Sequence, residues 1–113
     1  MQQRIPLGVA VALIVAAPLT LGQESASLEH GQDVFDHWCA PCHAPGPGHP
    51  GTQALDALYR GEKPGALEER SDLVPEVTRV FVRNGVSVMP PFRKTEITDA
   101  DLAALAAYLA PKD

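Results

Sequence analysis

The segment from Cys39 to His43 constrains this chain most, because it holds both cysteines in the pattern Cys-Ala-Pro-Cys-His. Two thiols three positions apart, with an imidazole directly after the second, form the attachment pattern of a c-type haem. We expect the sulfurs of Cys39 and Cys42 to bond to the two vinyl-derived carbons of the porphyrin. The turn between them then presents His43 to the iron as an axial ligand. The motif therefore predicts one covalently bound haem c.

Three other interpretations of the two cysteines are weaker. A thioredoxin-type dithiol opens a helix within a β-α-β unit, and this sequence contains no convincing strand. A zinc site would need further ligands, and the adjacent side chains of Cys42 and His43 would struggle to reach one tetrahedral ion. A structural disulfide would leave His43 without a role.

Met89 is the predicted second axial ligand of the iron. It is the only methionine after Met1, and Pro90 and Pro91 stiffen the segment that must hold its sulfur. A lone methionine is usually core filler, but the haem motif upstream favours a ligand here. A thioether opposite an imidazole raises the reduction potential relative to two imidazoles. It also fills the sixth position, so the sequence predicts a carrier of electrons, with no catalytic residue of its own.

Three histidines are the alternatives to Met89. His49 lies in a flexible loop near the motif, but it follows His43 by only six residues and would have to reach the opposite face of the haem. His30 and His37 lie in a predicted helix, where exposure to solvent is the usual state. The second nitrogen of His43 is expected to donate a hydrogen bond to a backbone carbonyl. We favour the carbonyl of Pro50 over those of Pro47 and Pro45.

Residues 1–22 are predicted to be a secretory signal peptide, cleaved after Gly22. Arg4 supplies a short positive start, and an apolar stretch over residues 5–17 follows, which is too short for a stable membrane anchor. Residues 23–113 then form one domain, and we expect it in the periplasm rather than embedded in a membrane. Cleavage removes one basic residue and no acidic one from a chain of net charge −5. This acidic balance argues against nucleic acid as a partner.

Apolar periodicity and helix-end signals predict an all-α domain, with three to four helices around the haem. Ser27 is a plausible cap for a first helix that follows a flexible leader over residues 23–27. Pro75 suits the first position of another helix, and Thr98 with Asp101 matches a capping box. The Pro-rich stretch over residues 39–51 and the polar stretch over residues 62–72 are expected to be loops. The predicted helices span residues 28–38, 52–60, about 75–84 and about 99–110.

The same residues resemble a class I c-type cytochrome over essentially all of residues 27–110. The resemblance is carried by Gly31 and Phe35 before the haem motif, by Met89-Pro90, and by Leu105-Ala106-Ala107-Tyr108-Leu109 near the end. It implies the small cytochrome c fold. In that family the first and last helices cross at the glycine, and aromatic residues hold the crossing; here these would be Gly31, Phe35 and Tyr108.

A narrower resemblance concerns the cytochrome subunit of bacterial flavocytochromes, the p-cresol methylhydroxylase and eugenol (4-alkylphenol) hydroxylase group. It rests on the segments 67–70 (Leu-Glu-Glu-Arg), 80–86 (Val-Phe-Val-Arg-Asn-Gly-Val) and 89–92 (Met-Pro-Pro-Phe). Val74 departs from the hydroxyl cap that is usual there. The resemblance implies an FAD-containing partner subunit that oxidises para-alkylated phenols and passes electrons one at a time to the cytochrome.

Two further functions stay open at this point. The chain could be a free periplasmic shuttle that carries electrons between other redox enzymes and a terminal oxidase. A haem-based sensor or enzyme is disfavoured because Met89 would close the sixth position of the iron. For the flavocytochrome subunit and for the free shuttle, the next electron acceptor is expected to be a soluble protein, such as a copper protein or another cytochrome.

Overall fold

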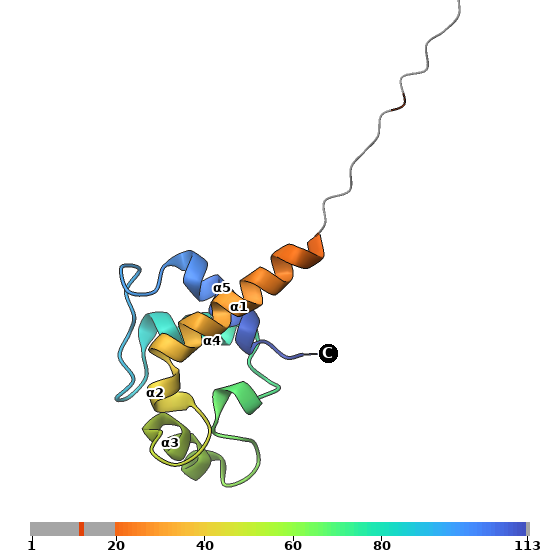
Figure 1. The fold of residues 1–113 in the computed structure, drawn as a ribbon. Helices are drawn as coiled ribbons and strands as arrows, with labels where there is room; N and C mark the ends of the chain where they lie inside the picture. The colour runs from red at the N-terminus through yellow and green to blue at the C-terminus, as the bar shows by residue number, and fades with distance from the viewer. Residues whose placement is uncertain (1–11, 13–19, 113) are drawn as a thin grey trace, which may run out of the picture.

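A computed structural model of the chain describes residue 12 and residues 20–112. Most of the predicted signal peptide therefore lies outside the described residues, and its cleavage after Gly22 stays a prediction. The described residues are all-helical, as predicted, apart from an isolated β bridge between Val86 and Met89. In chain order the elements are α1 (Thr20–Trp38), α2 (Ala40–His43), α3 (Pro50–Tyr59), the 3-10 helix η1 (Leu67–Glu69), α4 (Pro75–Asn84) and α5 (Asp99–Leu109) (Figure 1).

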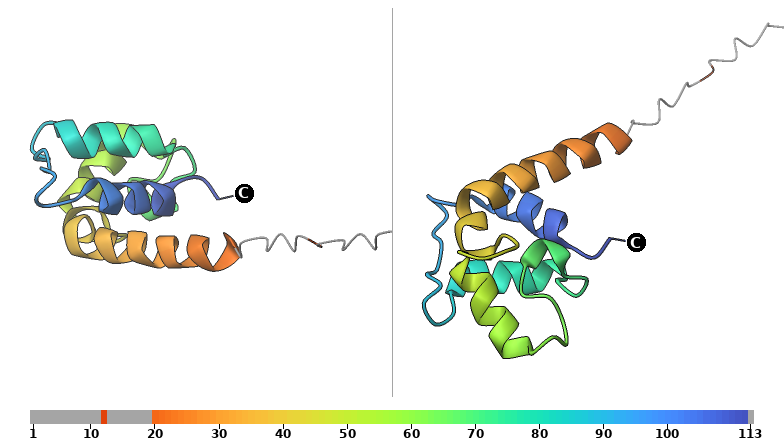
Figure 2. Two further views of the ribbon diagram at one scale, coloured as in Figure 1. Left: turned by 90° about the horizontal axis from the view of Figure 1, so that it is seen from above. Right: turned by 60° about the horizontal axis from the view of Figure 1, so that its bottom comes forward.

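The fold is organised by the crossing of α1 and α5, and α4 packs against the other side of α5 (Figure 2). Gly31 lies at the crossing, where an added Cβ would collide with the carbonyl of Ala104 and come within 2.7 Å of Cβ of Tyr108. The rings of Phe35 and Tyr108 then pack beside it, with their centroids 5.9 Å apart. The predicted roles of Gly31, Phe35 and Tyr108 are thus confirmed.

The apolar core forms where these three helices meet. Phe35 from α1, Leu105 from α5 and Ile97 from the preceding loop have no exposed surface. A domain of this size buries only a modest core, so a cofactor that fills space between the helices adds to its stability. The other buried members of the core cluster are Val34, Leu73, Val82, Leu102 and Leu109.

Several helix ends follow the sequence signals. The capping box at the start of α5 forms in both directions, since the Thr98 side chain accepts from the amide of Asp101 and the Asp101 side chain accepts from the amide of Thr98, each at 3.1 Å. Pro75 occupies the first turn of α4, and Val74 precedes it without a side-chain cap. This helix ends at Gly85, whose φ of 68° is one that glycine adopts without strain.

Three boundaries differ from the predictions. Helix α1 begins at Thr20, so Ser27 lies inside it, and residues 23–27 are helical rather than a flexible leader. Extending an existing helix costs little, because each added residue gains a hydrogen bond without a new nucleation step. The Pro-rich stretch contains the single turn α2, and α3 begins at Pro50; proline is tolerated in both places because it lies in the first turn. No helix in the described part of the chain combines the length and apolar character of a membrane span.

We predict that Gly31→Ala lowers the free energy of unfolding by about 1–3 kcal/mol, the usual cost of overpacking a close contact. The added methyl group must displace the backbone of α5 at Ala104. Urea unfolding of the haem-loaded protein measures the effect. Gln32→Ala, at the exposed neighbouring position, is the control and should change stability by less than about 0.5 kcal/mol. Equal stability of the two variants would contradict the close crossing.

Candidate functional site

The haem motif sits at the corner between α1 and α3. The amide of Cys39 donates to the carbonyl of Phe35 at 2.8 Å, which ends α1, and the amide of His43 donates to the carbonyl of Cys39 at 2.9 Å, which closes α2. This tight turn directs Cys39 and His43 into the same cavity, while Cys42 lies nearer the surface. Cys39 and Cys42 form no disulfide with each other in this structure, which argues against the disulfide alternative. Burial and the neighbouring Cys42 raise the pKa of Cys39 to about 12.

Met89 enters from a loop some fifty residues further along the chain. The loop folds back in a two-residue turn, in which Val86 and Met89 exchange backbone hydrogen bonds of 3.0 and 2.9 Å. Ser87 takes a left-handed φ of 54° within this turn. At Gly85 an added Cβ would lie 2.6 Å from the carbonyl oxygen of Met89 and 2.8 Å from the nitrogen of Pro91. The segment that carries Met89 is therefore compact and closely packed on itself.

Arg83 ties this loop to α4. Its Nη1 donates to the carbonyls of Phe92 at 3.1 Å and Ile97 at 2.9 Å, and its Nη2 donates to Asp99 at 2.9 Å. The amide of Phe92 also donates to the carbonyl of Val82 at 2.8 Å. Both backbone polar groups of Phe92 are thus bound to adjacent residues of α4, so the chain has a fixed anchor three residues after Met89.

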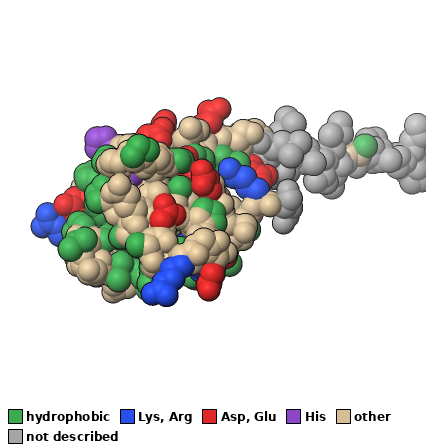
Figure 3. Space-filling model, turned by 90° about the horizontal axis from the view of Figure 1, so that it is seen from below, with side chains coloured by type: hydrophobic (Ala, Val, Ile, Leu, Met, Phe, Trp, Pro, Cys, Tyr) green, Lys and Arg blue, Asp and Glu red, His purple; other side chains and the backbone are tan. Residues whose placement is uncertain are grey.

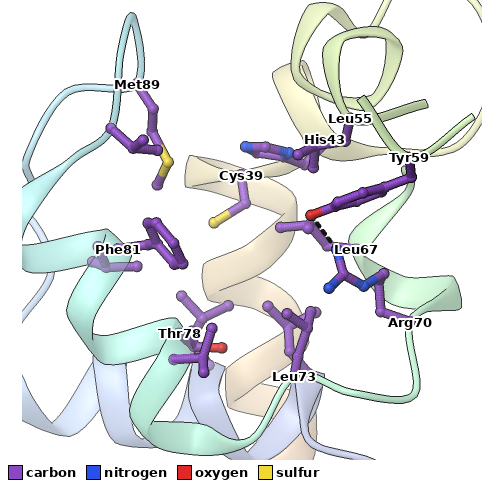
Figure 4. A pocket seen from close by; sticks show the side chains of 15 residues that line it. Cys39, His43, Leu55, Tyr59, Leu67, Arg70, Leu73, Thr78, Phe81 and Met89 are labelled. Atoms are coloured by element: carbon purple, nitrogen blue, oxygen red, sulfur yellow. Dashed lines mark hydrogen bonds between the residues drawn. The ribbon is translucent and has the colours of Figure 1, made fainter. Parts of the chain in front are cut away.

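Cys39, His43 and Met89 line one cavity system, which is predominantly apolar (Figure 4). The part among α3, α4 and α5 has a volume of about 160 Å³, and the adjoining part, between the haem motif and the Met89 loop, has a volume of about 370 Å³. The apolar lining of the cavity suits a large apolar group. Its aliphatic and aromatic lining includes Leu55, Leu67, Leu73, Val77, Phe81, Val82, Leu105 and Leu109 from the first part and Trp38, Ala54, Leu58 and Phe92 from the second.

The His43 ring is held closely but lacks one partner. Burial lowers its pKa, which favours the neutral imidazole that a metal requires. An added Cβ on Gly51 would lie 2.7 Å from Cε1 and 2.8 Å from Nδ1 of His43, so only glycine leaves room for the ring. Nδ1 is buried and has no hydrogen-bond partner among the described residues. The bond that we predicted to the carbonyl of Pro50 is thus not formed in this structure; Pro50 opens α3, where a carbonyl points along the helix axis.

The other histidines lie outside the cavity lining. His49 contacts the carbonyl oxygen of Pro41 through Nδ1 at 3.2 Å, and His30 contacts Asp101 through Nε2 at 2.7 Å across the crossing of α1 and α5. His37 packs edge-on against Trp38, with centroids 4.8 Å apart. Within the described residues no group of three or more His, Cys, Asp or Glu side chains could hold a metal, which disfavours the zinc alternative.

Sequence reasoning missed several residues of this site. Arg70 lines the cavity, but the stretch around it has no periodicity that would have predicted it. Tyr59, which lies in a predicted helix, lines the cavity as well. Arg60 and Arg79, two other basic residues that could serve a haem, do not line either part of the cavity. Gly51 could have been suspected from its place beside Pro50, but nothing local marks the contact of Arg83 with Phe92.

The geometry fits a flat apolar group bound by two sulfurs, an imidazole and a thioether. A family model described as "Cytochrome C oxidase, cbb3-type, subunit III" matches residues 26–109. The chain belongs to this family of c-type cytochrome domains. It therefore carries one covalently bound haem c and acts as an electron carrier.

Two curated proteins support this assignment. The chain is 33% identical to cytochrome c6 of Cyanidioschyzon merolae over 85 residues, which cover 75% of this chain and 74% of the relative. It is 32% identical to cytochrome c6 of Cyanidium caldarium over 88 residues, 78% of this chain and 73% of the relative. No solved structure matches the chain. The expected class I cytochrome is thus confirmed at the level of the family.

We predict that Arg83→Gln loosens the Met89 loop. The substitution removes hydrogen bonds from a charged donor to two backbone carbonyls, each worth about 1.5–3 kcal/mol. Amide hydrogen exchange at Met89 and Phe92 should accelerate by at least tenfold. In the control Arg79→Gln the lost contact is an exposed pair with Glu76 at 3.6 Å, and exchange in the loop should stay unchanged. If both variants exchange alike, Arg83 does not anchor the loop.

Proposed function

We propose that the haem is attached through Cys39 and Cys42 and that its iron is bound between His43 and Met89. The supporting observation is that Cys39, His43 and Met89, which come from two distant segments, line the same apolar cavity. Each thiol adds across one vinyl group, so the sulfur bonds to one carbon, the hydrogen goes to the other, and no electrons are lost or gained. The bound haem supplies a one-electron iron couple.

The residues around the haem set the conditions for rapid electron transfer. His43 enters as a neutral imidazole, since burial lowers its pKa, and Gly51 lets the ring sit close to α3. The compact loop around Met89 would hold the thioether in one position. The apolar lining excludes water and favours the less charged ferrous form.

Met89→Ala tests the axial assignment. We expect the near-infrared sulfur-to-iron band of the oxidised protein to disappear and the reduced protein to bind carbon monoxide. The control is His49→Ala, which removes the rival ligand; that variant should keep the band and exclude carbon monoxide. An unchanged spectrum for Met89→Ala, or loss of the band in His49→Ala, would refute the assignment.

The proposed biological role is that of the electron-accepting subunit of an FAD-containing enzyme that oxidises para-alkylated phenols. The flavin of such an enzyme takes two electrons from the phenol, and the cytochrome accepts them one at a time and passes each to a soluble acceptor such as a copper protein or another cytochrome. The support is the resemblance of residues 67–70, 80–86 and 89–92 to the cytochrome subunits of that group. The proposal includes export to the periplasm after cleavage at residue 22, with residues 23–113 as the cytochrome domain.

An exposed apolar rim around the cavity mouth fits a stable partner. Val88 in the Met89 loop is 96% exposed, and Trp38, Leu58, Phe81 and Val86 are also exposed. On the face drawn in Figure 3, hydrophobic side chains reach the surface at several places, with charged side chains among them. The two cations beside this loop, Arg93 and Lys94, already contact Glu96 at 3.5 Å and Asp99 at 3.0 Å. The apolar rim is therefore the stronger candidate for the contact.

A free shuttle is the second candidate, favoured by the similarity to cytochrome c6 over about three quarters of the chain. Purification from the native host at low salt separates the two roles: a subunit elutes with a yellow flavoprotein, and a shuttle elutes alone. Val88→Asp should reduce co-purification at least tenfold without changing the haem spectrum. Val80→Asp, an exposed valine on α4 outside the cavity lining, is the control and should still co-purify. Elution of the unaltered cytochrome alone would overturn the subunit proposal.

A further inference from the structure

Asn84 is the only asparagine of the chain, and a glycine follows it directly. Glycine has no side chain to obstruct its backbone nitrogen, so that nitrogen can attack the carboxamide carbon of a preceding asparagine. A carbon–nitrogen bond forms, the side-chain nitrogen leaves as ammonia with the hydrogen of the attacking amide, and a succinimide ring results. Water then opens the ring to aspartate or isoaspartate, without any oxidation or reduction.

Both reacting groups are engaged in the structure. The amide of Gly85 donates to the carbonyl of Phe81 at 2.8 Å, and Nδ2 of Asn84 donates to the carbonyl of Val80 at 2.8 Å. Asn84 is the last residue of α4, so these two bonds belong to its last turn. The nitrogen of Gly85 must leave Phe81 before it can attack. The reaction therefore requires the last turn of α4 to unwind.

The Met89 loop, residues 86–92, keeps this turn wound. The amide of Phe92 donates to the carbonyl of Val82 at 2.8 Å, so the loop binds a carbonyl that the end of a helix would otherwise leave without a partner. An added Cβ on Gly85 would lie 2.6 Å from the carbonyl oxygen of Met89, which shows that the loop packs directly on this glycine. Asn84 itself is exposed, so water reaches it as soon as the turn opens.

We propose that Asn84 is a deamidation site, which the Met89 loop closes while it is packed on α4. When the loop lifts, the amide of Phe92 leaves Val82, the last turn of α4 unwinds, and the nitrogen of Gly85 is free to attack. Such local openings occur without global unfolding, because the ends of helices and the loops on them are the least stable parts of a fold. The rate of deamidation thus follows the population of the open loop.

The products prevent the loop from closing as before. Each places a negative charge at the C-terminal end of α4, where the helix dipole disfavours it. The new carboxylate cannot donate to the carbonyl of Val80, so that hydrogen bond is lost. Isoaspartate also lengthens the backbone by one carbon directly before Gly85, whose surroundings leave no room for it. Deamidation therefore converts a transient opening of the loop into a permanent one.

Incubation of the haem-loaded protein at mildly alkaline pH, followed by peptide mass spectrometry, tests the proposal. Because the chain has no other asparagine, the two products at position 84 are measured without interference. Arg83→Gln, which removes the hydrogen bonds to the carbonyls of Phe92 and Ile97, should deamidate at least tenfold faster than the unaltered protein. Arg79→Gln loses only an exposed ion pair on the same helix and should deamidate at the unaltered rate. Equal rates in the two variants would overturn the proposal.

The unaltered protein in urea provides the test if Arg83→Gln fails to fold. In the unfolded chain the nitrogen of Gly85 has lost its bond to Phe81, so the products should form at least tenfold faster than in the folded protein. If the folded and unfolded chains deamidate at the same rate, the structure does not close the site and the proposal is wrong.

Asn84→Asp reproduces the aspartate product and tests the effect on the loop. Amide hydrogen exchange at Gly85 and Phe92 should be faster in this variant than in Asn84→Ala, which loses the same hydrogen bond to Val80 without adding a charge. Equal exchange in the two variants would show that the negative charge does not hold the loop open.

Discussion

The close crossing of α1 and α5 is the constraint on which the site depends. Cys39 follows directly after α1, and Leu105 and Leu109 of α5 line the cavity. The separation of the two helices therefore sets the distance between the sulfur of Cys39 and the leucine side chains of α5. Tyr108 also links the crossing to η1, because its hydroxyl donates a hydrogen bond to Glu68. Burial and that carboxylate raise the pKa of Tyr108 to about 12, so it stays a donor at neutral pH.

The two sides of the cavity differ in the polarity of their side chains. Near His43 and Met89 the cavity is apolar and closely packed, with Gly51 against the imidazole and Gly85 against the Met89 turn. Near Tyr59 and Arg70 it supplies charge and hydrogen bonds, which are stronger in such a low-dielectric place than in water.

Contacts between neighbours in the chain made much of this molecule predictable. The haem motif, the capping box of Thr98 with Asp101, and Pro75 and Gly85 at the ends of α4 depend on chemistry within a few residues. The crossing at Gly31 was predictable from the family pattern. The start of α1 was not predictable from the sequence. Extension of the helix into residues 20–27 changes the free energy only slightly, and no single residue there signals it.

The sequence by itself determined that this is an all-helical cytochrome with a covalent haem, because two thiols, an imidazole and the helix periodicity are local features of the chain. The tertiary structure alone decided which other residues face the haem cavity. Arg70 with Tyr59, and Arg83 with Phe92, Ile97 and Asp99, join positions 9 to 16 residues apart across loops. Their meeting depends on how the helices pack, and the same guanidinium groups would be unremarkable surface charges in any other arrangement.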